Sequence, residues 1–183
     1  AVKLTATTGK IDTDIDAAIA ATKDVTLLAD TNIVIDDTIA TTEGNVSLTA
    51  TKGSITLNDN LSTNSDAARG TAPATFATGN VTLTAKTDVT QNADILVKNG
   101  DVSVTATEGD LKMTTGKKAD ITSAGNIVYS AGKQLDSEIL ATKLGDITLT
   151  AGSDLLANNT ITTQGGAVKL TATTGKIDTD IDA

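Results

Sequence analysis

Three aspartates that alternate along one short segment are the side chains best placed to bind a metal ion. Asp12, Asp14 and Asp16 lie in KIDTDIDA, and carboxylate oxygens are the ligands that Ca²⁺ prefers. If the residues between them face a core, the three carboxylates line one outer edge. The residues expected to face inward are Ile11, Thr13 and Ile15. A calcium loop would need glycine at its sixth position and glutamate at its twelfth, where this chain has Ala17 and Lys23. Calcium is therefore one candidate, and a solvated acidic edge is the alternative.

Hydroxyl side chains form a second candidate surface. They occupy alternate positions in four similar segments: Ser47/Thr49, Thr82/Thr84, Ser103/Thr105 and Thr148/Thr150. On stacked strands they would form two columns, about 6.7 Å apart along a strand and about 4.8 Å apart between strands. Such Thr-x-Thr faces resemble those of some ice-binding proteins, although Lys3, Leu28 and Val128 interrupt the array. Threonine is also a favourable residue on any exposed strand, so a plain solvent face is the alternative.

A stretch at 64–78, NSDAARGTAPATFAT, is the third candidate. It contains Arg69, Pro73 and Phe76, and the chain has no other Arg, Pro or Phe. A long loop on a regular scaffold is where specific contacts usually lie. We expect either a lateral contact to another molecule or a bulge whose Phe76 folds back on its own scaffold.

Composition argues against several functions. The 183 residues include no His and no Cys, and the net charge is −9. A polysaccharide-cleaving site would need clustered cations and a tuned acid or base, so we expect no enzyme and no cofactor. A basic face, the usual mark of nucleic-acid binding, is not expected, and no apolar run is long enough to span a bilayer.

The elements that must position these residues follow an internal repeat. The pattern Gly-(Asn/Asp)-(Val/Ile)-x-Leu-Thr-Ala recurs as GNVSLTA, GNVTLTA, GDVSVTA, GNIVYSA and GDITLTA. Aligned copies give three apolar columns with Thr, Ser or Lys between them, an alternation typical of strands with one buried face. The first column is Val2, Val25, Val46, Val81, Val102, Ile127, Ile147 and Val168. The second is Leu4, Leu27, Leu48, Leu83, Val104, Tyr129, Leu149 and Leu170. The third is Ala6, Ala29, Ala50, Ala85, Ala106, Ala131, Ala151 and Ala172.

Two further apolar positions follow in each repeat. The first set is Ile11, Ile33, Ile55, Val89, Leu111, Leu135 and Leu155. The second is Ile19, Ile39, Leu61, Ile95, Ile121, Ile139 and Ile161. Three short strands in about 21 residues predict an all-β, right-handed parallel β-helix, a β-solenoid of about seven coils in 166 residues.

Glycines and Asn or Asp at the predicted corners fit this fold, because they tolerate the left-handed backbone of sharp turns. The segment DAAIAATK at 16–23 has a local helical alternative by propensity. Tyr129 is the one oversized residue of its column, and we expect its hydroxyl to need a hydrogen-bond partner or an exit to solvent.

The opening and closing seventeen residues are identical: AVKLTATTGKIDTDIDA stands at 1–17 and at 167–183. We therefore interpret 1–166 as one solenoid unit, with an insertion at 64–78, and 167–183 as the first coil of the next unit. Neither end has the atypical polar cap that closes an isolated solenoid. The partners expected are adjacent copies of the same unit, within one chain or head to tail, with lateral bundling as a further possibility.

The runs GNVTLTA, GDITLTAGSDLLANNTI and GNVSLTATKGSITL resemble the repeats of filamentous-haemagglutinin-like exoproteins, the large adhesins of two-partner secretion, and related giant bacterial surface proteins. The resemblance covers nearly the whole chain outside 64–78. It implies an exported, extracellular shaft that holds a distal domain away from the cell, and it carries over no catalytic residue. A surface-binding module that uses the Thr face for ice or glycans is the alternative.

Overall fold

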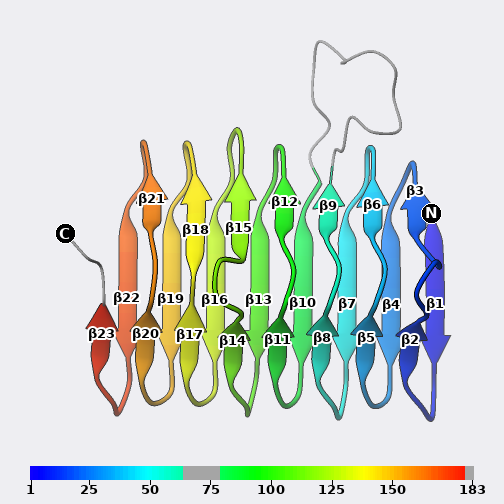
Figure 1. Cartoon of the computed structure of the whole chain (residues 1–183), viewed down its shortest axis with the longest axis horizontal. Coiled ribbons are helices and arrows are strands. Elements are labelled where there is room, and N and C mark those ends of the chain that lie inside the picture. Colours follow the sequence, from blue (N-terminus) through cyan, green and yellow to red (C-terminus); the bar gives the residue numbers. More distant parts are fainter. Residues whose placement is uncertain (64–78, 180–183) are drawn as a thin grey trace.

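Every third strand of this chain joins the same parallel sheet. The computed structural model describes residues 1–63 and 79–179, and the regular structure in these ranges is entirely β-strand. The strands form three sheets of eight, eight and seven members, and the chain passes from one sheet to the next in a fixed order (Figure 1). This arrangement is a parallel β-solenoid with three strands per coil, as the sequence predicts.

The strand boundaries repeat closely from coil to coil. The first sheet contains β1 (Val2–Ala6), β4 (Val25–Ala29), β7 (Val46–Ala50), β10 (Val81–Ala85), β13 (Val102–Ala106), β16 (Ile127–Ala131), β19 (Ile147–Ala151) and β22 (Val168–Ala172). The second contains β2 (Ile11–Thr13), β5 (Ile33–Ile35), β8 (Ile55–Leu57), β11 (Val89–Gln91), β14 (Leu111–Met113), β17 (Leu135–Ser137), β20 (Leu155–Ala157) and β23 (Ile177–Thr179). The third contains β3 (Ile19–Ala21), β6 (Ile39–Thr41), β9 (Leu61–Thr63), β12 (Ile95–Val97), β15 (Lys118–Ile121), β18 (Ile139–Thr142) and β21 (Ile161–Thr163). We number the coils 1 to 8, each beginning with a strand of the first sheet.

The register of the first sheet matches the three sequence columns. Val81 pairs with Val46 on one side and with Val102 on the other, although 35 residues separate the first pair and 21 the second. The stacking therefore continues in register past 64–78.

The columns form one apolar core through the middle of the solenoid. In coils 2 to 7 every residue of the three columns is at most 4% exposed. The two end coils are more open, because no described strand stacks on their outer side: Leu4 is 42% exposed and Val168 is 45% exposed. Burial is thus supplied by neighbouring coils, as expected for a solenoid.

The predicted column of the third sheet is wrong at two positions. Ala119, not Ile121, pairs with Ile95, and Leu140, not Ile139, pairs with Ala119. The cause is the corner before the third strand, which differs in length between coils. In coil 5 an extra turn contains Gly116, whose φ is 77°. The DAAIAATK segment is also not helical: it contains β3.

Three glycines (Gly100, Gly116 and Gly125) have the positive φ that the corner prediction expects, but other corner glycines are required for a different reason. Gly145 has no positive φ, yet a Cβ built on it would lie 1.7 Å from the carbonyl oxygen of Gly125 in the coil before. Gly152 meets Gly132 in the same way, at 1.9 Å. Close approach of successive coils, rather than turn conformation, requires glycine at these two corners.

Candidate functional site

The alternation that would place the three aspartates on one edge ends after Thr13. Asp12 points outward from β2 while Ile11 and Thr13 are buried. The expectation that Ile15 faces inward is wrong, because Ile15 is 75% exposed. Alternation stops there because the chain turns: the Ala17 amide donates to the Asp14 carbonyl at 3.1 Å, and Asp16 has a φ of 72°.

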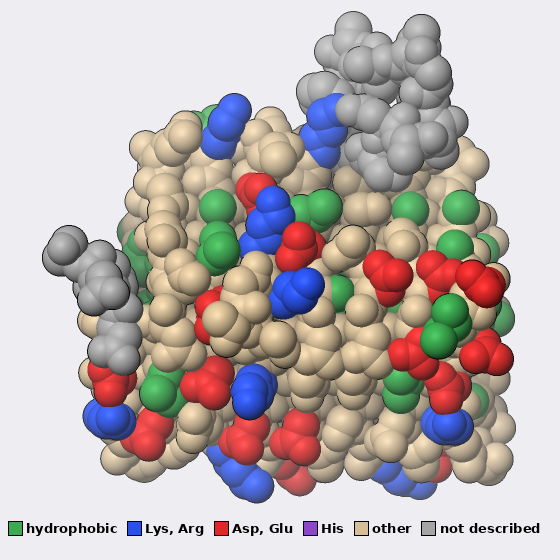
Figure 2. Space-filling view, in the orientation of Figure 1, with side chains coloured by type: hydrophobic (Ala, Val, Ile, Leu, Met, Phe, Trp, Pro, Cys, Tyr) green, Lys and Arg blue, Asp and Glu red, His purple; other side chains and the backbone are tan. Residues whose placement is uncertain are grey.

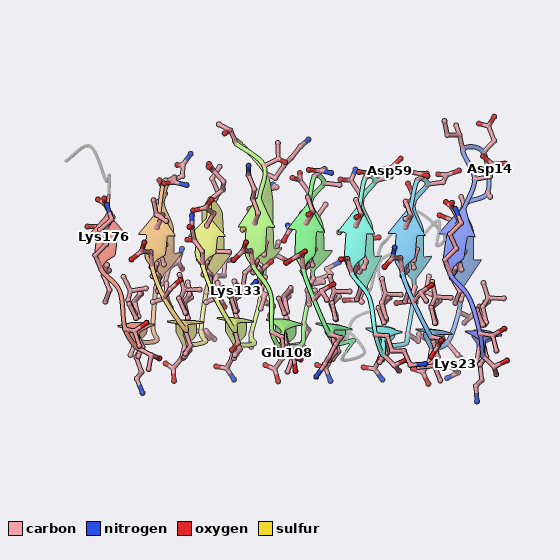
Figure 3. All side chains as sticks on the ribbon, turned by 90° about the horizontal axis from the view of Figure 1, so that it is seen from below. Asp14, Lys23, Asp59, Glu108, Lys133 and Lys176 are labelled. Atoms are coloured by element: carbon pink, nitrogen blue, oxygen red, sulfur yellow. The ribbon has the colours of Figure 1, made fainter. Side chains whose placement is uncertain are left out.

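The surroundings of these carboxylates are those of a solvated surface. The Lys10 Nζ donates to an oxygen of Asp12 at 2.5 Å, and this hydrogen bond raises the pKa of the lysine. Figure 2 shows acidic side chains gathered over the N-terminal coils, and Figure 3 shows Asp14 and Asp59 pointing outward on the same side of the solenoid. Within residues 1–63 and 79–179, no group of three or more acidic, His or Cys side chains is arranged to hold a metal ion.

The hydroxyl columns lie in the predicted register on the outer face of the first sheet. One column is unbroken over six coils, and each of its side chains is half-exposed: Thr49, Thr84, Thr105, Ser130, Thr150 and Thr171. The other is interrupted by Val128, which pairs with both Ser103 and Thr148. The face is therefore a regular array of hydroxyls with two apolar breaks, Leu28 in coil 2 and Val128 in coil 6.

A ladder of Asn and Asp side chains, not foreseen from the sequence, connects the coils beside the first sheet. The Oδ1 atom of each residue accepts the backbone N–H of its equivalent in the next coil, at 2.7–2.9 Å. The acceptors are Asp24, Asn45, Asn80, Asp101, Asn126 and Asp146. The Gly-(Asn/Asp) pairs of the repeat were the sequence signal for this ladder, but they indicate contacts between coils rather than local turns. Each bond satisfies a backbone donor that the corner leaves outside the sheet ladder.

The expected partner of Tyr129 is a buried glutamine. The Tyr129 hydroxyl, fully buried, donates to Gln91 Oε1 at 2.7 Å. Gln91 Nε2 donates in turn to the carbonyls of Ala93 and Lys118, at 3.0 Å each. In the coil between, Tyr129 pairs with Val104, which is smaller than the Leu found in most of this column. Burial raises the pKa of the Tyr129 hydroxyl far above its ordinary value.

Glu138 is a second buried polar residue that the sequence analysis missed. It is 3% exposed and accepts from the Gly116 amide at 3.3 Å and from Asn159 Nδ2 at 3.4 Å. Its contacts tie the extra turn of coil 5 to the coils that follow.

The lateral-contact hypothesis rests on Arg69, Pro73 and Phe76, which lie outside the described residues. It stays a prediction.

The fold defines the chain as a member of the β-solenoid class. Comparison with protein-family models, with curated proteins and with solved structures gave no match. Within the described ranges, no helix has the length and apolar character needed to cross a membrane.

Proposed function

We propose that this chain is a non-catalytic structural repeat of a long extracellular fibre or adhesin shaft, located at a bacterial cell surface and built by end-to-end stacking of solenoid units. One observation carries the proposal. Strand β22, which repeats the residues of β1, stacks on β19 in the same register as every earlier pair, with Ile147 opposite Val168 and Ala151 opposite Ala172. The solenoid thus passes residue 166 without a change of structure.

The role is mechanical. Each coil gains its burial and its backbone hydrogen bonds from its neighbours, so a longer stack adds interfaces without adding new kinds of contact. The Asn and Asp ladder and the aliphatic columns run along the same axis and oppose bending between coils. An extended shaft of this kind can hold another domain away from the surface that carries it.

Electron microscopy of cells that make the protein tests this role. Seven coils advance about 34 Å, so deletion of one 166-residue copy from an array should shorten surface fibres by about that length. Absence of fibres, or fibres whose length does not follow the number of copies, would contradict the proposal.

The unbroken hydroxyl column favours a second candidate, a module that binds ice or glycans. Replacing Thr84 and Thr105 with lysine places charge in the middle of this column without touching the core. A shaft would keep its fibre length after this change, whereas a binding module would lose retention on ice or on a glycan array.

A further inference from the structure

Among the described strands, none pairs with the outer side of coil 1, which is an apolar edge. Strands β1, β2 and β3 each stand at the end of their sheet. Leu4 is 42% exposed there, and Val2 and Ile19 are half-buried. An open edge also leaves alternate backbone amides and carbonyls without sheet partners, which makes it a template for another strand.

The same edge occurs a second time in the chain, and there it is covered. Residues 167–183 repeat 1–17, so β22 and β23 are copies of β1 and β2. They pack on β19 and β20 of coil 7. The surface of coil 7 that contacts coil 8 is therefore complementary to the outer edge of coil 1, because coils 1 and 8 share the same sequence.

Hydrogen bonds of both backbone and side chains hold this contact in register. The Ala167 amide donates to Asp146 Oδ1 at 2.8 Å, and the Lys176 amide donates to Asp154 Oδ1 at 2.9 Å. The Leu155 amide donates to the Lys176 carbonyl at 2.9 Å. Coil 7 thus offers two carboxylate acceptors at the positions where the edge presents two backbone donors.

We propose that the outer edge of coil 1 is a docking surface for the C-terminal side of coil 7 in a second copy of residues 1–166. The register places Val2 opposite Ile147, Leu4 opposite Leu149 and Ala6 opposite Ala151. This inference rests on the proposed function and specifies its junction: neighbouring units meet directly, in register, with no linker between them.

The acceptors favour this pairing over the alternative in which coil 1 stacks on coil 8. Coil 8 has Ala167 and Lys176 where coil 7 has Asp146 and Asp154. Neither side chain has an oxygen to accept the Ala1 or Lys10 amide. Both side-chain bonds of the junction would be lost in that arrangement.

Cross-linking in a chain extended by one further copy of 1–166, placed before residue 1, tests the junction. The chain contains no cysteine, so two introduced thiols form a unique pair. Thr148→Cys in the first copy and Lys3→Cys in the second should react with a short thiol-specific cross-linker. The matched control is Thr148→Cys with Lys169→Cys in the 183-residue chain, where the two positions are paired.

We expect the junction pair to cross-link at about the rate of the control, and a Thr148/Thr5 pair, out of register by two residues, to react at least about tenfold more slowly. Cross-linking of the control without cross-linking of the junction pair would overturn the inference. Equal rates for the Lys3 and Thr5 pairs would overturn it as well. The cross-linking experiment tests only the junction between units and involves no cell surface. A negative result would therefore be distinct from a negative result for the fibre role, which electron microscopy tests.

Discussion

Replacing Gly145 with alanine should destabilise the solenoid, although alanine is usually tolerated where the backbone φ is negative. The new Cβ would lie 1.7 Å from the Gly125 carbonyl oxygen, whereas ordinary contact begins at 3.4 Å. The two coils would have to separate locally by a comparable distance. Two hydrogen bonds at this corner oppose such a shift: Asp146 N to Asn126 Oδ1 and Ile127 N to the Asp146 carbonyl, both 2.9 Å.

The expected magnitude follows from two opposing effects. Overpacking of this severity lies near the upper end of the usual range, about 3 kcal/mol. Loss of glycine from the unfolded chain offsets about 0.4–1 kcal/mol of that cost. The free energy of unfolding should therefore fall by about 2 kcal/mol.

Denaturant unfolding followed by tyrosine fluorescence measures the change, because Tyr129 is the only Tyr and the chain has no Trp. Gly9→Ala is the matched control: no atom lies within 4 Å of a Cβ built there, and its φ is not positive. That variant should be neutral or slightly more stable. Equal unfolding midpoints for the two variants would refute the explanation of the corner glycines by close approach.

Three further changes test the contacts between coils. Tyr129→Phe leaves the Gln91 oxygen without its hydroxyl partner in the core and should lower the free energy of unfolding by about 1–3 kcal/mol. Adding Gln91→Met, which places at this position the residue found one coil later, should restore part of the lost stability. No recovery in the double variant would contradict this explanation. Asn80→Ala removes the acceptor for the Asp101 amide and should cost about 0.5–1.5 kcal/mol by the same denaturant assay, whereas Asn80→Asp keeps the acceptor and should cost less. Because the pKa of Tyr129 is raised, the folded state holds its hydroxyl neutral. The contribution of the neutral hydroxyl to the free energy of unfolding is complete below the unfolded pKa of about 10 and is lost as the pH rises above that value. Ultraviolet absorbance should therefore detect tyrosinate only as the chain unfolds at alkaline pH; a free tyrosinate transition near pH 10 in the folded chain would show that Tyr129 is accessible.

The strands were predictable because the sequence repeats its own pattern. Val25, Leu27 and Ala29 align with Val46, Leu48 and Ala50 by simple inspection, and the structure pairs them in that order. Alternation with period two fixes the buried face once the strand is known. The register of the first two sheets followed from the same alignment.

The errors occurred where corner length varies. Ile121 and Ile139 were misplaced because coils 5 and 6 change the number of residues before the third strand, and a regular spacing cannot reveal that change. Ile15 was misplaced for the same reason, since the chain turns after Thr13. The pairing of Tyr129 with Gln91 spans 38 residues and two coils, so only the stacked structure brings these side chains together.

Solution X-ray scattering from chains of one, two and three joined units tests the central claim most directly. If strands of successive units stack in register, the maximum dimension should grow by about 34 Å for each added unit, with a constant cross-section. Units that fold separately and move on linkers would instead give irregular increments and a flexible profile, and that result would contradict the account.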